Sequence, residues 1–157
     1  MSNLEKILNS IIKFGLYAIL LTPLIFWPRA LYAFMTPKFI LFQVLVEIVF
    51  AAWLILKTID SKNQYKNNWL ILAIFLYFTV SFISSIFGVD FSRSFWGIGA
   101  RMTGLFAELH FLAWFLVLVG YFKNKEEWNR YLSTSFAMCV LVAITGFFTV
   151  LEWRLVP

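Results

Sequence analysis

The chain has 157 residues, of which 62% are hydrophobic, 20% are aromatic and only 13% are charged, and its formal net charge is +5. Soluble domains carry about 25% charged residues, so this composition excludes an ordinary soluble globular protein and places the chain in the membrane class. The basic residues lie between apolar runs, which is typical of a membrane topology signal, so we expect no nucleic-acid partner.

Five apolar segments follow one another along the chain. Most approach the ~20 residues that a membrane-spanning helix needs. We place the spans near residues 11–27, 39–56, 69–87, 104–122 and 131–153. The sequence therefore predicts an all-α, polytopic integral membrane protein that forms one membrane domain over residues 1–157.

The first segment has a second interpretation as a secretory signal peptide, with Lys6 and Lys13 as its basic region. Pro23, Trp27 and Arg29 make a poor cleavage region. We therefore interpret this segment as a retained span, which needs Ile11 and Ile12 to reach a sufficient length.

The loop charges predict the orientation of the spans. Of the 13 Lys and Arg residues, eight fall in loops on the side of the N-terminus: Lys6, Lys13, Lys57, Lys62, Lys66, Lys123, Lys125 and Arg130. Five fall on the other side: Arg29, Lys38, Arg93, Arg101 and Arg154. The positive-inside rule then places the N-terminus in the cytoplasm and the loops at 28–38 and 88–103 on the outer face.

Four cations on the outer face are not required by the topology rule: Arg29, Lys38, Arg93 and Arg101. One interpretation is that they bind an anionic ligand. The alternative is that they are interfacial anchors whose long side chains reach the surface from helix ends.

Several polar residues lie inside the predicted spans. Gln43 and Glu47 are four residues apart and share one helical face. A charge near the middle of a span costs roughly 2.5–3.5 kcal/mol on insertion scales, so Glu47 should pair with another group, face the bundle interior or be protonated. His110 is interpreted first as a hydrogen-bonded packing residue, because no second His or Cys at ligand spacing supports a metal site.

The stretch "SFWGIGARMTGLF" (94–106) lies between the third and fourth spans. If the fourth span begins by Arg101, then Arg101, Gly104 and Glu108 share a helical face, and Gly104 allows close approach of another backbone or a lipid headgroup. Arg101 would then lie at a helix N-terminus, where an anion is favoured. Gly97 permits a tight fold, and Trp96 suits the membrane interface. The glycines fit no nucleotide-binding pattern.

Two stretches together resemble the O-antigen ligase family: "FMTPKFILFQVLVEI" (34–48) and "GVDFSRSFWGIGARMTGLFAELHFLAWFLVL" (88–118). The first resembles the family's second span, with a Thr-x-Lys stretch before a helix containing Val-Glu-Ile. The second resembles an outward loop with Ser-Phe-Trp-Gly and Arg-x-x-Gly-Leu-Phe, followed by a His-containing helix. Pro37 stands where many relatives have glycine.

The resemblance implies a polytopic glycosyltransferase of the cytoplasmic membrane. Such proteins take a glycan from undecaprenyl diphosphate on the outer face and pass it to lipid A core, a growing polymer or a protein, with no cofactor. By this resemblance Arg101, Lys38, Arg93 and Arg29 would contact the carrier diphosphate. Trp96, Gly97, Gly104, Glu47, Glu108 and His110 would support the site.

The resemblance covers only the N-terminal portion of a family member, so we expect the chain to lack the catalytic later half and to be inactive alone. His110 does not match the family's catalytic histidine, and no residue of this chain is assigned a catalytic role. Two alternatives stay open: a small membrane subunit of a transporter, with Glu47 and His110 lining a path, or a membrane scaffold without chemistry.

Overall fold

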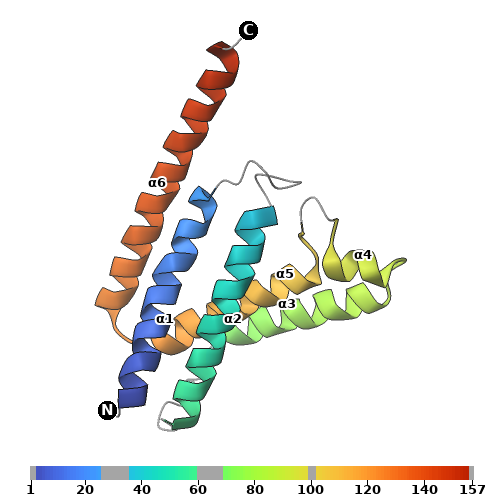
Figure 1. Cartoon of the computed structure of the whole chain (residues 1–157). Helices are drawn as coiled ribbons and strands as arrows, with labels where there is room; N and C mark the ends of the chain where they lie inside the picture. Colours follow the sequence, from blue (N-terminus) through green and yellow to red (C-terminus); the bar gives the residue numbers. More distant parts are fainter. Residues whose placement is uncertain (1–2, 26–35, 60–68, 99–101, 156–157) are drawn as a thin grey trace.

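The computed structural model describes residues 3–25, 36–59, 69–98 and 102–155, and these residues form helices (Figure 1). In chain order the elements are α1 (Asn3–Leu21), the 3-10 turn η1 (Thr22–Leu24), α2 (Thr36–Ile59), α3 (Trp69–Ile86), α4 (Phe91–Trp96), α5 (Leu105–Tyr121) and α6 (Lys125–Leu155). No strand occurs in the described ranges, so the predicted all-α class is confirmed.

Three helical stretches are long and apolar enough to cross a membrane: Asn3–Leu24, Thr36–Ile59 and Lys125–Phe148. Two more apolar helices, α3 and α5, correspond to the predicted segments at 69–87 and 104–122 and are shorter in their described apolar parts. The chain therefore has the helices of a membrane protein, and at least three match the span length that a bilayer requires.

The helix ends follow local chemistry rather than the edges of the apolar runs. α1 begins at Asn3, well before the predicted span at 11–27, because polar residues such as Glu5 and Lys6 continue a helix readily. It ends before Pro23, which cannot donate a backbone hydrogen bond. Pro37 lies in the first turn of α2, where its missing N–H costs nothing.

The centre of the fold is the antiparallel pair of α1 and α2, with α6 beside α1 (Figure 1). Ile12 and Leu16 of α1 and Val46 and Val49 of α2 are almost completely buried in the core. A Cβ atom at Gly15 would collide with the Val49 side chain, so this glycine lets the two helices approach closely.

Tyrosines join the start of α6 and the end of α5 to α1. The Tyr131 hydroxyl donates to the Leu16 carbonyl at 3.4 Å, and its ring packs edge-on against Tyr17 with centroids 5.6 Å apart. The Tyr121 hydroxyl donates to the Asn9 carbonyl at 3.2 Å. These contacts place the turn between α5 and α6 at the same end of the molecule as the first half of α1.

α3 and α5 run across the direction of α1 and α2 (Figure 1). α5 contacts α2 and α3, and the short helix α4 joins α3 to α5 at one edge of the molecule. None of the described side chains of α3 is buried, although most of them are apolar and the helix carries no charged residue. Such a helix is typical of one that faces lipid or a further protein surface.

Candidate functional site

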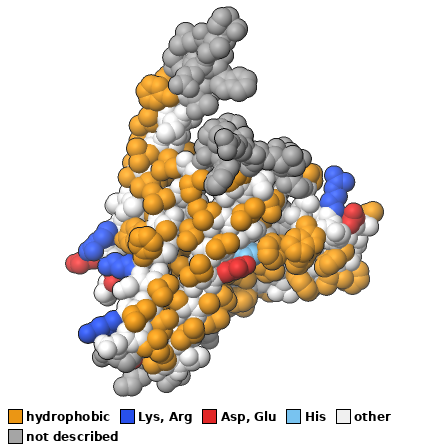
Figure 2. All heavy atoms as spheres, in the orientation of Figure 1, with side chains coloured by type: hydrophobic (Ala, Val, Ile, Leu, Met, Phe, Trp, Pro, Cys, Tyr) orange, Lys and Arg blue, Asp and Glu red, His pale blue; other side chains and the backbone are white. Residues whose placement is uncertain are grey.

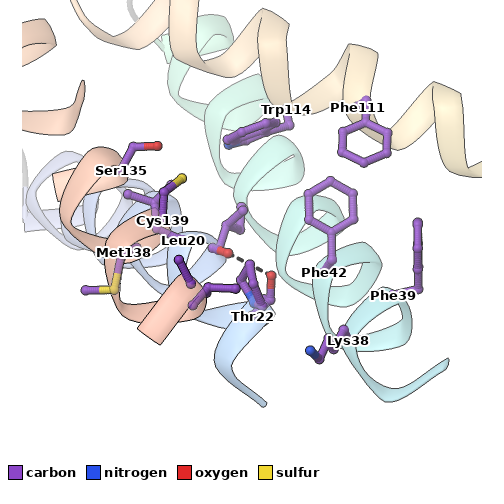
Figure 3. Close-up of a pocket in the computed structure, with 14 residues that line it drawn as sticks. Leu20, Thr22, Lys38, Phe39, Phe42, Phe111, Trp114, Ser135, Met138 and Cys139 are labelled. Atoms are coloured by element: carbon purple, nitrogen blue, oxygen red, sulfur yellow. Dashed lines mark hydrogen bonds between the residues drawn. The ribbon is translucent and has the colours of Figure 1, made fainter. Parts of the chain in front are cut away.

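An apolar groove of about 540 Å³ opens between α1, α2, α5 and α6 (Figure 3). Its lining consists almost entirely of aliphatic, aromatic and sulfur-containing side chains, with one cation: Ile19, Leu20, Thr22, Pro23, Lys38, Phe39, Phe42, Phe111, Trp114, Ser135, Met138, Cys139, Val142 and Ala143. The volume lies within the ~300–1,000 Å³ of typical ligand sites.

Aromatic side chains from α2 and α5 form one wall of this groove. The Phe42 ring lies 4.7 Å from the Phe111 ring and 6.1 Å from the Trp114 ring, centroid to centroid. Met138 and Cys139 of α6 face this wall from the other side (Figure 3). The groove can therefore hold a flexible hydrocarbon chain by dispersion contacts along its length.

The start of α2 supplies the polar end of the groove. Lys38 lies in the first turn of α2 and lines the groove. The Thr36 hydroxyl oxygen is buried and has no hydrogen-bond partner among the described residues. Backbone N–H groups of a first helical turn have no intrahelical acceptor and favour an anion. Lys38 therefore places a cation where an anionic head could join an apolar tail, in the first turn of a helix whose N-terminus favours an anion.

The four predicted anion-binding cations do not all reach this site. Arg29 and Arg101 lie outside the described residues. Arg93 is exposed on α4, and no residue of α4 lines the groove. Of the two described cations, only Lys38 is placed at the groove.

The described parts of the stretch predicted to bind the diphosphate, 94–98 and 102–106, lie at an elbow between α4 and α5. The Asp90 carboxylate caps α4 by accepting from the backbone N–H of Arg93 at 3.0 Å. Gly97 ends the helix at φ 76°, a conformation that favours glycine. A Cβ atom at Gly104 would meet the backbone of Phe95 and Gly97, so Gly104 allows close approach of a backbone, as predicted.

The predicted entry of the helix at Arg101 is wrong. α5 begins at Leu105 with Gly104 as its N-cap, and Met102, at φ 50°, is not helical. Because Met102 is left-handed and Gly104 precedes the first helical residue, helical spacing does not extend from Glu108 back beyond Gly104. Arg101 itself lies outside the described residues.

Trp96 and Glu108 occupy separate positions around the elbow. Trp96 is exposed, and its ring lies 5.0 Å from the Phe106 ring. Glu108 lines a hydroxyl-rich hollow of about 340 Å³ between α3, α4 and α5, with the side chains of Ser81, Ser84, Ser85, Ser94 and Thr103. One carboxylate oxygen of Glu108, Oε2, is buried without a hydrogen-bond partner in the described part of the chain.

Glu47 and His110 form a polar pair between α2 and α5. The His110 Nε2 atom lies 3.1 Å from Glu47 Oε1, and His110 Nδ1 lies 2.7 Å from the Phe106 carbonyl oxygen. A carbonyl oxygen only accepts, so Nδ1 carries a proton. Nε2 and Oε1 can then bond only if a second proton lies on one of them. The pair therefore holds this proton between its two members and has no net charge.

Pairing with another group was one of the three alternatives that the sequence left open for Glu47, and the structure shows a pairing with His110. The sequence also predicted a hydrogen-bonded packing role for His110, but not that the two residues are each other's partners. The groove residues Phe39, Phe42, Phe111, Trp114 and Cys139 were missed, because an aromatic side chain in a span gives no signal of which helix it faces. The cap at Asp90 had a signal, because aspartate is one of the residues preferred at a helix N-cap.

No cluster of three or more His, Cys, Asp or Glu side chains that could hold a metal ion occurs within the described ranges. No protein-family model, curated protein or solved structure matches this chain. The chemistry of the groove and of the polar pair therefore carries the functional argument.

Proposed function

We propose that this chain is the N-terminal transmembrane portion of an O-antigen ligase-like glycosyltransferase, which transfers a glycan from undecaprenyl diphosphate on the outer face of the cytoplasmic membrane. The observation that supports this proposal is the apolar groove with Lys38 at its edge. Its role would be to hold the lipid carrier. The sequence resemblance at 34–48 and 88–118 supplies the reaction class.

The division of the groove matches the division of such a carrier. An isoprenoid tail needs a long apolar surface, which Phe42, Phe111 and Met138 supply. A diphosphate needs fixed positive charge and hydrogen-bond donors, which Lys38 and the first turn of α2 supply. Cations at the diphosphate would also stabilise the leaving group when the glycan is transferred. Arg29 and Arg101, which lie outside the described residues, are proposed as further cations for the head. Arg93 is not, because no residue of α4 lines the groove.

The membrane arrangement proposed here has five spans with the N-terminus in the cytoplasm, in the inner membrane. Lys13, near the middle of α1, and Arg130, early in α6, line one recess of about 230 Å³ together with Glu126 and Glu127, so these two basic residues lie on the same part of the molecule. This grouping supports the orientation suggested by the loop charges. In this proposed orientation Lys38, at the other end of α2 from Lys57, would face the outer side.

Protection of Cys139 tests carrier binding directly. Cys139 is the only cysteine of the chain and lines the groove. We expect undecaprenyl diphosphate to slow the alkylation of Cys139 by a membrane-permeant maleimide in micelles. Gly146→Cys in a Cys139→Ser background is the matched control on the same helix, since Gly146 has open space around it and does not line the groove. Equal slowing at both positions, or none at Cys139, would refute carrier binding in the groove.

Substitution of Lys38 tests the recognition of the diphosphate. Lys38→Ala should weaken protection by about tenfold in carrier concentration, because a charge-assisted hydrogen bond is lost. Lys6→Ala removes an exposed lysine of α1 that does not line the groove and should leave protection unchanged. Undecaprenol, which has no diphosphate, should protect Lys38→Ala and the unmodified chain equally.

A transporter subunit remains the second candidate, because Glu47 and His110 are in contact and share a proton. The three cavities described above are lined by neither residue. The pair is therefore not part of a described path, and the groove favours the first proposal.

A further inference from the structure

The surface around Glu47 combines an exposed carboxylate with an apolar helix face. The Glu47 side chain is 64% exposed, whereas that of His110 is 9% exposed. The exposed neighbours on the same helix are apolar: Ile40, Val44, Ile48, Ala51, Leu54 and Ile55. Figure 2 shows the chain's single histidine beside an acidic side chain within a field of hydrophobic side chains.

Glu47 lies deep in α2. It is eleven residues from Thr36 and twelve from Ile59, so it is roughly 16–18 Å along the axis from either end of the helix. If α2 spans the membrane as proposed above, neither water nor a lipid headgroup reaches this depth. A lipid tail covers the apolar neighbours well but offers no hydrogen-bond donor to the carboxylate.

The carboxylate keeps one unused acceptor. His110 Nε2 meets Oε1, and no other partner of the Glu47 side chain occurs among the described residues. His110 itself is fully engaged, since its Nδ1 donates to the Phe106 carbonyl. A hydrogen-bond acceptor without a donor is unfavourable at this depth in the membrane. In membrane proteins, polar side chains of neighbouring helices commonly supply the missing hydrogen bond.

We propose that this face of α2, centred on Glu47, docks a further transmembrane helix that brings a neutral hydrogen-bond donor to the free carboxylate oxygen. The donor is a serine, threonine, asparagine or glutamine side chain. A lysine or arginine fits less well: the Glu47–His110 pair has no net charge, so a cation would leave an unbalanced charge in the hydrocarbon region. The apolar residues on either side supply the packing surface for the docked helix.

The test uses the full chain in bilayers and a defined probe. The chain carries Cys139→Ser and Ser92→Cys, which places a donor fluorophore on exposed α4 and leaves the docking face unmodified. The probe is a polyleucine transmembrane peptide with one central asparagine and an acceptor fluorophore. We expect energy transfer to report association at least about five-fold stronger than for the same peptide without asparagine.

Variants at position 47 identify the acceptor. Glu47→Leu should abolish the preference for the asparagine peptide. Glu47→Gln should retain it, because its amide can donate to His110 and keep its carbonyl oxygen free. Thr79→Leu is the matched control: it removes an exposed hydroxyl on α3 that is already bonded to the Phe75 carbonyl at 2.8 Å, so the preference should persist.

Three outcomes would overturn the proposal. They are equal association of both peptides, a preference that survives Glu47→Leu, or Glu47-dependent pairing of two labelled chains without any peptide, which would assign the face to a second copy. The result is independent of carrier binding in the groove, because the probe contains neither isoprenoid nor phosphate. Circular dichroism would verify that each variant keeps its helices.

Discussion

Glycines at the elbow between α4 and α5 determine how closely the two helices meet. Gly97 has φ 76°, and a Cβ atom there would lie 2.6 Å from the Gly104 nitrogen and 2.8 Å from the Thr103 nitrogen. Those atoms belong to the backbone, which cannot move aside as cheaply as a side chain. Both conformation and space therefore require glycine at this position.

We expect Gly97→Ala to destabilise the elbow by about 1–3 kcal/mol, the usual cost of a strained backbone conformation. Thermal unfolding in micelles, followed by circular dichroism, would measure the change. Gly146→Ala is the matched control, because nothing lies within 4 Å of the added carbon and alanine favours a helix. An equal effect at both positions would show that the elbow is not constrained as described.

Individual residues also show where sequence reasoning ends. The length of the apolar run alone showed that Glu47 lies deep in a span. That depth predicted that its carboxylate needs a partner. Its partner His110 is 63 positions away, and only the packing of α5 on α2 decides which side chains meet. The predicted helix start at Arg101 was wrong for a different reason. The prediction extended helical spacing through Met102, and nothing in the composition indicates that Met102 is left-handed.

At the scale of elements, apolar run length predicted the helices well. The predicted segments at 69–87 and 104–122 correspond to α3 (Trp69–Ile86) and α5 (Leu105–Tyr121). The ends of α1 and α6 were predicted poorly, because polar residues such as Lys125 and Glu126 are helical without being apolar. The groove could not be predicted, since four separate helices line it and their relative positions depend on packing.

The contact between α1 and α2 depends on Gly15. The added carbon at this position would overlap the Val49 side chain, and Val49 is only 1% exposed, so it has little room to move. We expect Gly15→Leu to lower stability by roughly 1–3 kcal/mol through overpacking. The same substitution at Gly146 should have little effect, and reversible unfolding in mixed micelles would compare the two.

A weaker effect at Gly15 than at Gly146 would contradict the close approach of α1 and α2. Val49→Ala offers a second check, because it removes the overlapping methyl groups. Combined with Gly15→Ala, it should be less harmful than the sum of the two single changes, since neighbouring sites are not additive.

At the scale of the whole molecule, the number of spans is the central question. α1, α2 and the Lys125–Phe148 part of α6 have the length and hydropathy of membrane-crossing helices. α5 has 17 residues, or about 26 Å of helix against a hydrocarbon core of ~30 Å. It also runs across α1 and α2, as does α3 (Figure 1). If the chain has five spans, α3 and α5 must cross the membrane where the bilayer is locally thinner.

Labelling at two positions distinguishes five spans from three. With the N-terminus inside, α1 and α2 return the chain to the cytoplasm, so a cysteine at position 63 is inside in either case. Position 92, on α4, is outside only if α3 crosses the membrane. We expect Ser92→Cys, in a Cys139→Ser background, to react with an impermeant maleimide on intact cells, and Asn63→Cys to react only after permeabilisation. Protection of both positions would mean that α3 and α5 do not cross. Labelling of position 63 from outside would reverse the orientation and place Lys38 on the cytoplasmic side, away from an outward-facing carrier diphosphate.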